Sequence, residues 1–145
     1  MASVTTTEGK NYLLGAAIKG SVSPISSWFV SAYKANVTPA NTWTAANWVA
    51  LGTEVVSSEV TQATRPAFTL GTVSGGSVDN SASPARITAS AGNTITLYGA
   101  VLVSTSAWAA VTGTLLAAIP FAASKTLVGD DGDYLDITIT ITVAD

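Results

Sequence analysis

The sequence predicts an all-β fold, a single antiparallel β-sandwich of the jelly-roll type with one or two short helices. Residues 135–143 alternate strictly between apolar and polar side chains, which is the period of a half-buried strand. Several other short segments rich in β-branched residues are separated by turns that contain Gly, Asn or Asp. The 145 residues amount to one domain. We therefore expect residues 1–145 to fold as one unit, with residues 1–10 as an N-terminal arm.

The N-terminal part of the chain is predicted to hold both helices. Residues 11–20 fit a short helix that ends at Gly20, because glycine readily takes the left-handed conformation found after helices. Residues 27–33 are aromatic and β-branched and fit a strand. The Ala-rich residues 38–51 fit one or two helical turns.

The rest of the chain is predicted to be extended. Residues 54–68 are extended, and the double glycine in residues 74–85 indicates a loop or the end of a hairpin. Further strands are expected at residues 85–90, 93–104 and 113–123, where Pro120 points to an edge or a bend.

The C-terminal strand carries the clearest pattern. It follows a predicted turn at residues 129–133. One face is expected to be buried and consists of Leu135, Ile137, Ile139, Ile141 and Val143. The other face is polar and consists of Asp136, Thr138, Thr140 and Thr142. Such a Thr row resembles an ice-binding surface, but a single row is explained by pairing with threonines of a neighbouring strand.

Composition argues against most catalytic and nucleic-acid functions. The chain has no His and no Cys, so a Cys/His zinc site, a His-activated nucleophile and a disulfide are all excluded. Six basic against nine acidic residues make no basic surface for nucleic acid. We expect no enzyme, no cofactor and no metal.

The long uncharged stretch between Arg86 and Lys125 raises the question of a membrane span. Ser, Thr, Gly and Pro interrupt every window of the length that a spanning helix needs. The stretch is therefore predicted to form strands within a core or an interface. The N-terminus lacks the basic and apolar regions of a signal peptide, and none is expected.

Two groups of acidic residues are candidates for a functional site. The acids around Gly132 could ligate a hard cation, but an acidic turn before a strand is favoured; the group comprises Asp130, Asp131, Asp133 and Asp136. Glu54 and Glu59 could act as a glycosidase pair. Five residues apart on a strand, they would face opposite ways, so two surface acids are favoured.

Arg65 and two tryptophans are the remaining candidates. Arg65 is either a buried anchor for a carboxylate, which its planar guanidinium suits, or an ordinary surface residue. Trp43 and Trp48 could form an exposed sugar-stacking pair, although core or interface packing is favoured. Together with the row Thr138, Thr140 and Thr142, these three residues are the candidate interface residues.

The order of features resembles that of small structural proteins encoded among the head and tail genes of tailed phages. The likeness covers most of the chain and rests on Glu54, Val55, Arg65, residues 80–82 (NSA), 99–103 (GAVLV), 113–117 (GTLLA) and 125–135. Two positions depart from the pattern. The aromatic residue expected before Arg65 is missing, and the Gly-Asp turn is lengthened to GDDGD.

The resemblance implies a capsid cement or decoration protein that binds the major capsid protein and bridges capsomers in the virion, after assembly in the host cytoplasm. A tail-fibre or collar adaptor is the alternative, and a carbohydrate-binding module based on Trp43 and Trp48 is a second. Only 10% of the residues are charged, which suits a protein that buries its surface against others and forms a homo-oligomer. Head or tail location, oligomer number and the face that meets the capsid stay open.

Overall fold

A computed structural model describes residues 3–143, and most of its regular structure is antiparallel strand. The strands are β1 (Val4–Thr5), β2 (Phe29–Tyr33), β3 (Ser77–Asp79), β4 (Ala85–Thr88), β5 (Thr94–Val103), β6 (Leu115–Val128), β7 (Tyr134–Ile137) and β8 (Thr140–Thr142). The helical segments are α1 (Thr7–Leu14), the π-helical η1 (Gly15–Lys19), α2 (Trp48–Gly52) and the 3₁₀ turn η2 (Gly129–Asp131). This confirms a β-rich, antiparallel fold with short helices.

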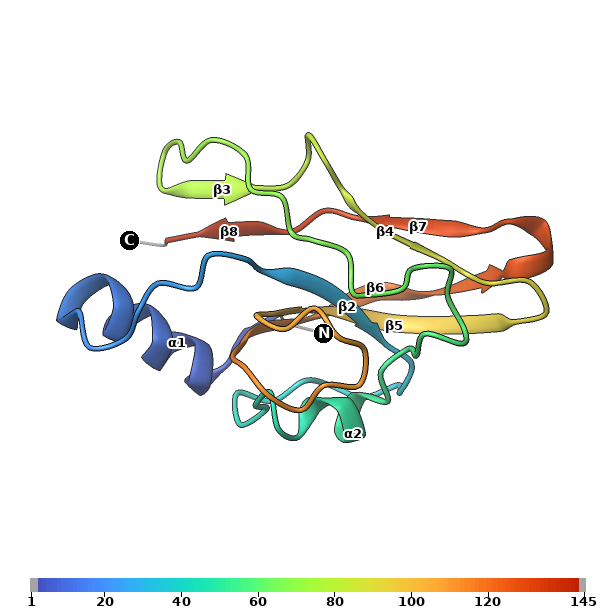
Figure 1. Ribbon diagram of the computed structural model, residues 1–145, viewed down its shortest axis with the longest axis horizontal. Coiled ribbons are helices and arrows are strands. Elements are labelled where there is room, and N and C mark those ends of the chain that lie inside the picture. The colour runs from blue at the N-terminus through green and yellow to red at the C-terminus, as the bar shows by residue number, and fades with distance from the viewer. Residues whose placement is uncertain (1–2, 144–145) are drawn as a thin grey trace.

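The strands form one four-stranded sheet and two strand pairs. The sheet has the order β1-β6-β5-β2, and the pairs are β3-β8 and β4-β7. Figure 1 shows the two pairs lying as a second layer over the sheet. The layers share an apolar core, in which Val30 and Leu102 of the sheet are fully buried with Ile87 of β4.

The opposite face of the sheet is covered by residues 43–52. Trp43 and Trp48 pack there against Val101 and Leu115. The carboxylate of Glu8 fastens this cover to the sheet, because its Oε2 accepts the backbone N–H groups of Ala45 and Leu115, each at 2.8 Å. The part of the sheet beneath residues 43–52 is therefore buried on both faces, whereas residues 122–126 of β6 are exposed.

The N-terminal residues are integrated in the fold as far as they are described. β1 pairs with β6, with Val4 opposite Ala118, and α1 already begins at Thr7. The side chain of Thr6 caps α1 by accepting the N–H of Gly9 at 3.0 Å. Residues 3–10 thus do not form a separate arm. The predicted helix end is confirmed, since Gly20 has a φ of 63° directly after η1.

Several predicted strands are confirmed. β2, β4 and β5 lie within residues 27–33, 85–90 and 93–104, and β6 extends the one predicted at residues 113–123 to Val128. Residues 54–68, in contrast, form turns with isolated bridges. The one or two helical turns predicted within residues 38–51 are confirmed as α2, which begins at Trp48.

The C-terminal strand is divided into β7 and β8, with residues 138 and 139 between them. The predicted inward face is confirmed for Ile137 and Ile139, which are buried, whereas Val143 is 80% exposed.

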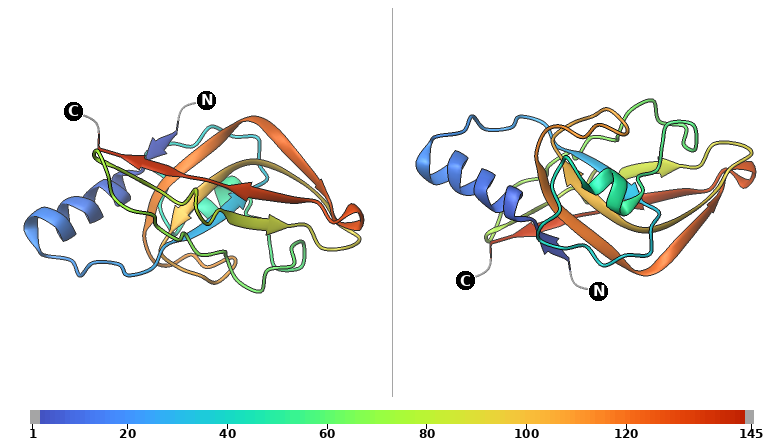
Figure 2. Two further views of the ribbon diagram at one scale, coloured as in Figure 1. Left: turned by 90° about the horizontal axis from the view of Figure 1, so that it is seen from above. Right: turned by 90° about the horizontal axis from the view of Figure 1, so that it is seen from below.

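α1 projects from the strand layers, as Figure 2 shows. Among residues 3–143, no helix is long and apolar enough to cross a membrane.

Candidate functional site

Glu54 and Arg65 form a bidentate ion pair inside the molecule. Arg65 Nε lies 2.6 Å from Oε1 of Glu54, and Nη2 lies 2.8 Å from Oε2, with both side chains 0% exposed. Of the two readings of Arg65, the buried carboxylate anchor is therefore confirmed. The prediction that Glu54 is a surface acid is wrong.

The remaining hydrogen bonds of this pair tie down the loop between β5 and β6. Glu54 also accepts the hydroxyl of Ser31 and the backbone N–H of Ala109, while Arg65 donates to the carbonyl of Thr105. Ala109 adopts a φ of 58°, which is uncommon for a residue with a Cβ. A buried ion pair needs such additional bonds to offset its desolvation. The pair thus fixes the shape of the loop and offers no exposed carboxylate.

Glu59, the second residue of the candidate glycosidase pair, does not contact Glu54. It binds Lys34 Nζ at 2.6 Å, and both side chains are about one quarter exposed. The two glutamates therefore engage different cations.

Trp43 and Trp48 are core residues, with exposures of 5% and 0%. Trp43 packs edge-on against Tyr33, and the guanidinium of Arg65 lies 5.3 Å from the Trp48 ring centroid. An exposed sugar-stacking pair at these two residues is overturned by their burial. None of Trp43, Trp48 and Arg65 is a surface residue, so the candidate interface loses half of its members.

The acidic residues around Gly132 serve the local backbone. Asp130 accepts the N–H of Gly92 at 2.7 Å, and Asp133 accepts the N–H of Val128 at 3.0 Å. Asp136 forms a bidentate pair with Arg86, and these hydrogen bonds hold the pKa of Asp136 below its usual range. No cluster of three or more carboxylates that could hold a metal occurs among residues 3–143.

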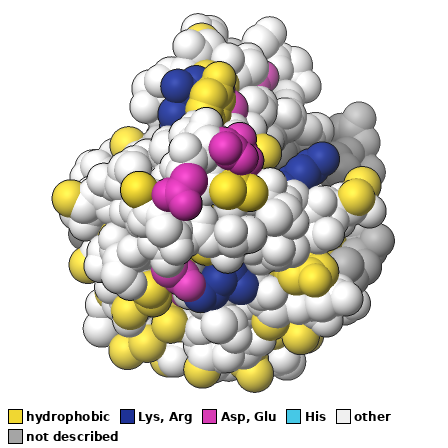
Figure 3. All heavy atoms as spheres, turned by 90° about the vertical axis from the view of Figure 1, so that its right-hand side faces the viewer, with side chains coloured by type: hydrophobic (Ala, Val, Ile, Leu, Met, Phe, Trp, Pro, Cys, Tyr) yellow, Lys and Arg dark blue, Asp and Glu magenta, His cyan; other side chains and the backbone are white. Residues whose placement is uncertain are grey.

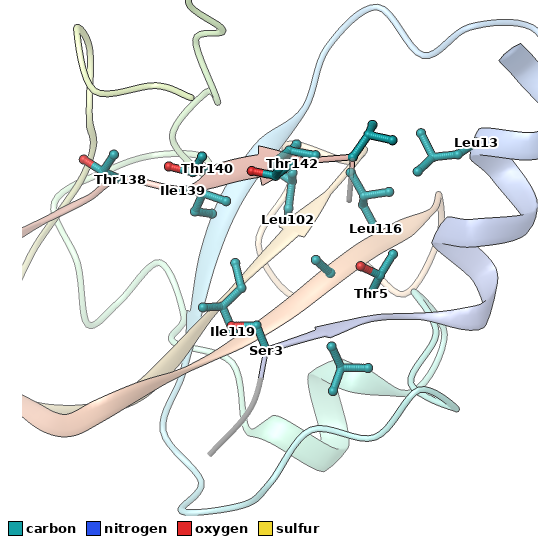
Figure 4. Close-up of a pocket in the computed structure, with 14 residues that line it drawn as sticks. Ser3, Thr5, Leu13, Leu102, Leu116, Ile119, Thr138, Ile139, Thr140 and Thr142 are labelled. Carbon is teal, nitrogen blue, oxygen red and sulfur yellow. The ribbon is translucent and has the colours of Figure 1, made fainter. Parts of the chain in front are cut away.

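A groove of about 340 Å³, lined mainly by apolar atoms, lies at one side of the two layers. β1 and β6 form its floor, and residues 138–143 form its opposite lip, as seen in Figure 4. Leu102, Leu116, Ile119 and Ile139 lie between these walls. None of its 14 lining residues has a titratable side chain. The groove can hold an apolar segment but has no group for acid–base chemistry.

Thr138, Thr140 and Thr142 are brought together along the lip of this groove, and all three are exposed. Among residues 3–143, β8 pairs with β3 alone, so its other backbone edge is open. The Thr row is therefore an open strand edge, which makes it the part of the predicted interface that is accessible to a partner.

Charged side chains lie at both ends of the molecule, and the end formed by α1 and η1 exposes large apolar side chains beside Lys10 and Lys19. Lys and Arg side chains lie beside Asp and Glu side chains on the end that faces the viewer in Figure 3. At the other end, α1 and η1 expose Leu14 and Ile18 to 61% and 80%, and Val143 follows β8. The groove and the Thr edge continue onto this end through Leu13 and Val143.

Asn80 and β1 are site elements that the sequence analysis did not identify. Asn80 is buried and binds the backbone on both sides of the gap between β7 and β8. In the sequence, the one indication of its role is that Asn80 stands next to a predicted turn. β1 has two residues, too few for a periodic pattern.

No known protein family model matches the chain, and no curated protein is significantly similar to it.

Proposed function

We propose that this chain is a structural, adhesive protein of a tailed-phage virion, a cement or decoration protein that binds the major capsid shell and bridges capsomers. The observation that carries the adhesive part is the uncharged groove with its open strand edge. A recess that lacks titratable side chains suits permanent contact with another protein.

The distribution of charge supports the same role. The 145 residues include only 15 charged side chains, and six of these are matched within the chain, in the ion pairs Lys34–Glu59, Glu54–Arg65 and Arg86–Asp136. Exposed Leu14 and Ile18 need a cover, since soluble monomers usually avoid large apolar surfaces. Binding is expected to change little with salt, because few ion pairs are there to be screened.

We also propose that the two layers form a β-sandwich of the jelly-roll type. Support comes from the core that they share, with Val30 and Leu102 from one layer and Ile87 and Ile137 from the other. Such a body is rigid enough to present a groove and an edge in fixed geometry.

A tail-fibre or collar adaptor remains the alternative within the virion. A cement protein covers the head in many copies, whereas an adaptor occupies one vertex or the tail in a few copies. Copy number in purified particles therefore separates the two.

Rebinding to empty heads tests the proposal. Empty heads of the phage that encodes this chain are mixed with the purified protein and sedimented at low and high salt. We expect saturable binding that is similar at both salt concentrations. Ile18→Asp should weaken it, whereas Asp131→Asn, a matched exposed change at the end opposite α1, should not. Absence of co-sedimentation, or full binding by the Ile18→Asp variant, would contradict the proposal.

A further inference from the structure

We propose that two copies of this chain associate by antiparallel pairing of their β8 edges across a twofold axis at Thr140. This deepens the proposed function, because it names the contact by which the protein self-associates. It is tested in solution without any capsid, so its failure and the failure of capsid binding are separate results.

Among residues 3–143, the backbone of the C-terminal strand makes hydrogen bonds along one of its two edges and none along the other. The odd-numbered residues face the partner strands: the O atom of Asp133 accepts from Ala89, and the N–H groups of Ile139 and Val143 bind Asn80 and Gly76. In a strand, neighbouring residues direct their N–H and C=O groups to opposite edges. The N–H and C=O groups of Thr138, Thr140 and Thr142 therefore point to the open edge.

Only the β8 part of this edge is unprotected. Natural strand edges are commonly protected by charged side chains or proline. The β7 part follows this rule, since Asp136 carries a bidentate ion pair with Arg86, whose guanidinium covers the Tyr134 ring at 3.8 Å. Residues 137–143 contain neither a charge nor a proline. The open segment is thus confined to the lip of the apolar groove.

The edge is complementary to itself. With Thr140 opposite Thr140 of the second copy, Thr138 lies opposite Thr142, and all these pairs are of the hydrogen-bonded kind. Threonine pairs of this sort stabilise antiparallel sheets. The two strand pairs β3-β8 would then join into one four-stranded sheet.

The same register explains the incomplete burial of the inward face. Ile139 would lie opposite Ile141 of the second copy, in the closer, non-hydrogen-bonded type of pair. Ile141 is only partly buried in the single chain, and Val143, which is 80% exposed, would meet Ile137 of the second copy. Pairing therefore extends the core of each copy across the axis and covers the mouth of both grooves.

The self-complementary register favours a second copy over a different chain, and the lack of local charge permits this contact. The chain carries a net charge of −3, so two copies repel weakly overall. Among residues 3–143, neither the groove lining nor residues 137–143 of the open edge carry a charge, so contact between these residues brings no like charges together. A partner with charged residues along its strand would have to desolvate them against the apolar lip.

Charge-reversed variants at the axis test this arrangement. Thr140→Lys places two ammonium groups opposite each other, and Thr140→Glu places two carboxylates there. We expect each variant alone to dimerise at least roughly tenfold more weakly than the natural chain in sedimentation experiments, because like charges directly opposite are destabilising. An equimolar mixture should restore a dimer of one copy of each. Thr94→Lys and Thr94→Glu, at an exposed strand position near the end opposite α1, serve as controls and should dimerise normally.

Amide hydrogen exchange of the natural chain provides a second test that needs no variant. The amides of Thr138, Thr140 and Thr142 should exchange more slowly as concentration rises, whereas the amide of Ile139, already bonded to Asn80, should change little. A monomer at all concentrations, or Thr140 variants that dimerise as the natural chain does, would overturn the proposal.

Discussion

Asn80 Oδ1 accepts the backbone N–H of Ile139 at 2.7 Å, at the point where β7 ends and β8 has not yet begun. Its Nδ2 donates to the carbonyl of Ile137 at 3.0 Å. The side-chain amide thus takes the place of a backbone peptide between the pairs β4-β7 and β3-β8. Residues 134–142 consequently run in one direction, with the odd-numbered side chains on the inward face throughout. The open edge of β8 is thereby held over the groove.

Asn80→Ala is expected to destabilise the fold by about 2–4 kcal/mol, because it leaves two buried backbone groups without partners. Asn41→Ala, at an exposed asparagine, is the matched control and should change the free energy of unfolding by less than about 0.5 kcal/mol. Chemical denaturation measures both. Equal effects of the two variants would mean that the amide of Asn80 does not support the strand.

Arg65→Ala is expected to cost about 3–5 kcal/mol, because it leaves the buried carboxylate of Glu54 uncompensated. Replacement of both partners by Met at position 65 and Leu at position 54 should restore much of the loss, since no buried charge then remains. The exposed pair of Arg86 with Asp136 is the control, and Arg86→Ala should cost at most about 1 kcal/mol. If Arg65→Ala unfolds no more easily than Arg86→Ala, the pair does not hold the loop.

Strands were predictable from sequence where the alternation of apolar and polar residues shows which side chains are buried. In residues 134–143 the alternation of Ile and Thr reflects burial on one side, and Ile137 and Ile139 are buried as predicted. The break in this strand was not predictable, because it is set by Asn80, some 57 to 59 residues away along the chain.

The sites depended on contacts that no local pattern encodes. The spacing of Glu54 and Glu59 suggested two surface acids, but Glu54 is paired with Arg65 through a turn that the extended reading of residues 54–68 missed. The groove was likewise hidden, since it needs β1 from one end of the chain beside β8 from the other.

Ile139→Ala tests the facing of the C-terminal strand. Ile139 is 6% exposed and lies in the core that the two layers share, so its truncation should cost about 2–5 kcal/mol through lost burial and a cavity. Thr140→Ala removes an exposed hydroxyl next to it and should leave the melting temperature nearly unchanged at protein concentrations low enough for the chain to be monomeric. An unchanged melting temperature for Ile139→Ala would show that the strand faces the other way.

Tyr33 makes stability fall at alkaline pH. Burial raises the pKa of Tyr33 to about 12, and the hydroxyl has no hydrogen-bond partner. The folded chain keeps this proton up to a higher pH than the unfolded chain, whose tyrosines ionise near 10. Between pH 10 and 12 the unfolded state therefore binds fewer protons, and the free energy of unfolding decreases as pH rises.

Tyr33→Phe removes both the unpaired hydroxyl and this titration. Its advantage over the natural chain should grow across this interval, to on the order of 2 kcal/mol. Tyr134→Phe, at a ring that is 52% exposed, is the control and should show no such growth. Urea unfolding at pH 8 and in steps above pH 10 measures the difference, and parallel curves for the natural chain and Tyr33→Phe would refute a raised pKa at Tyr33.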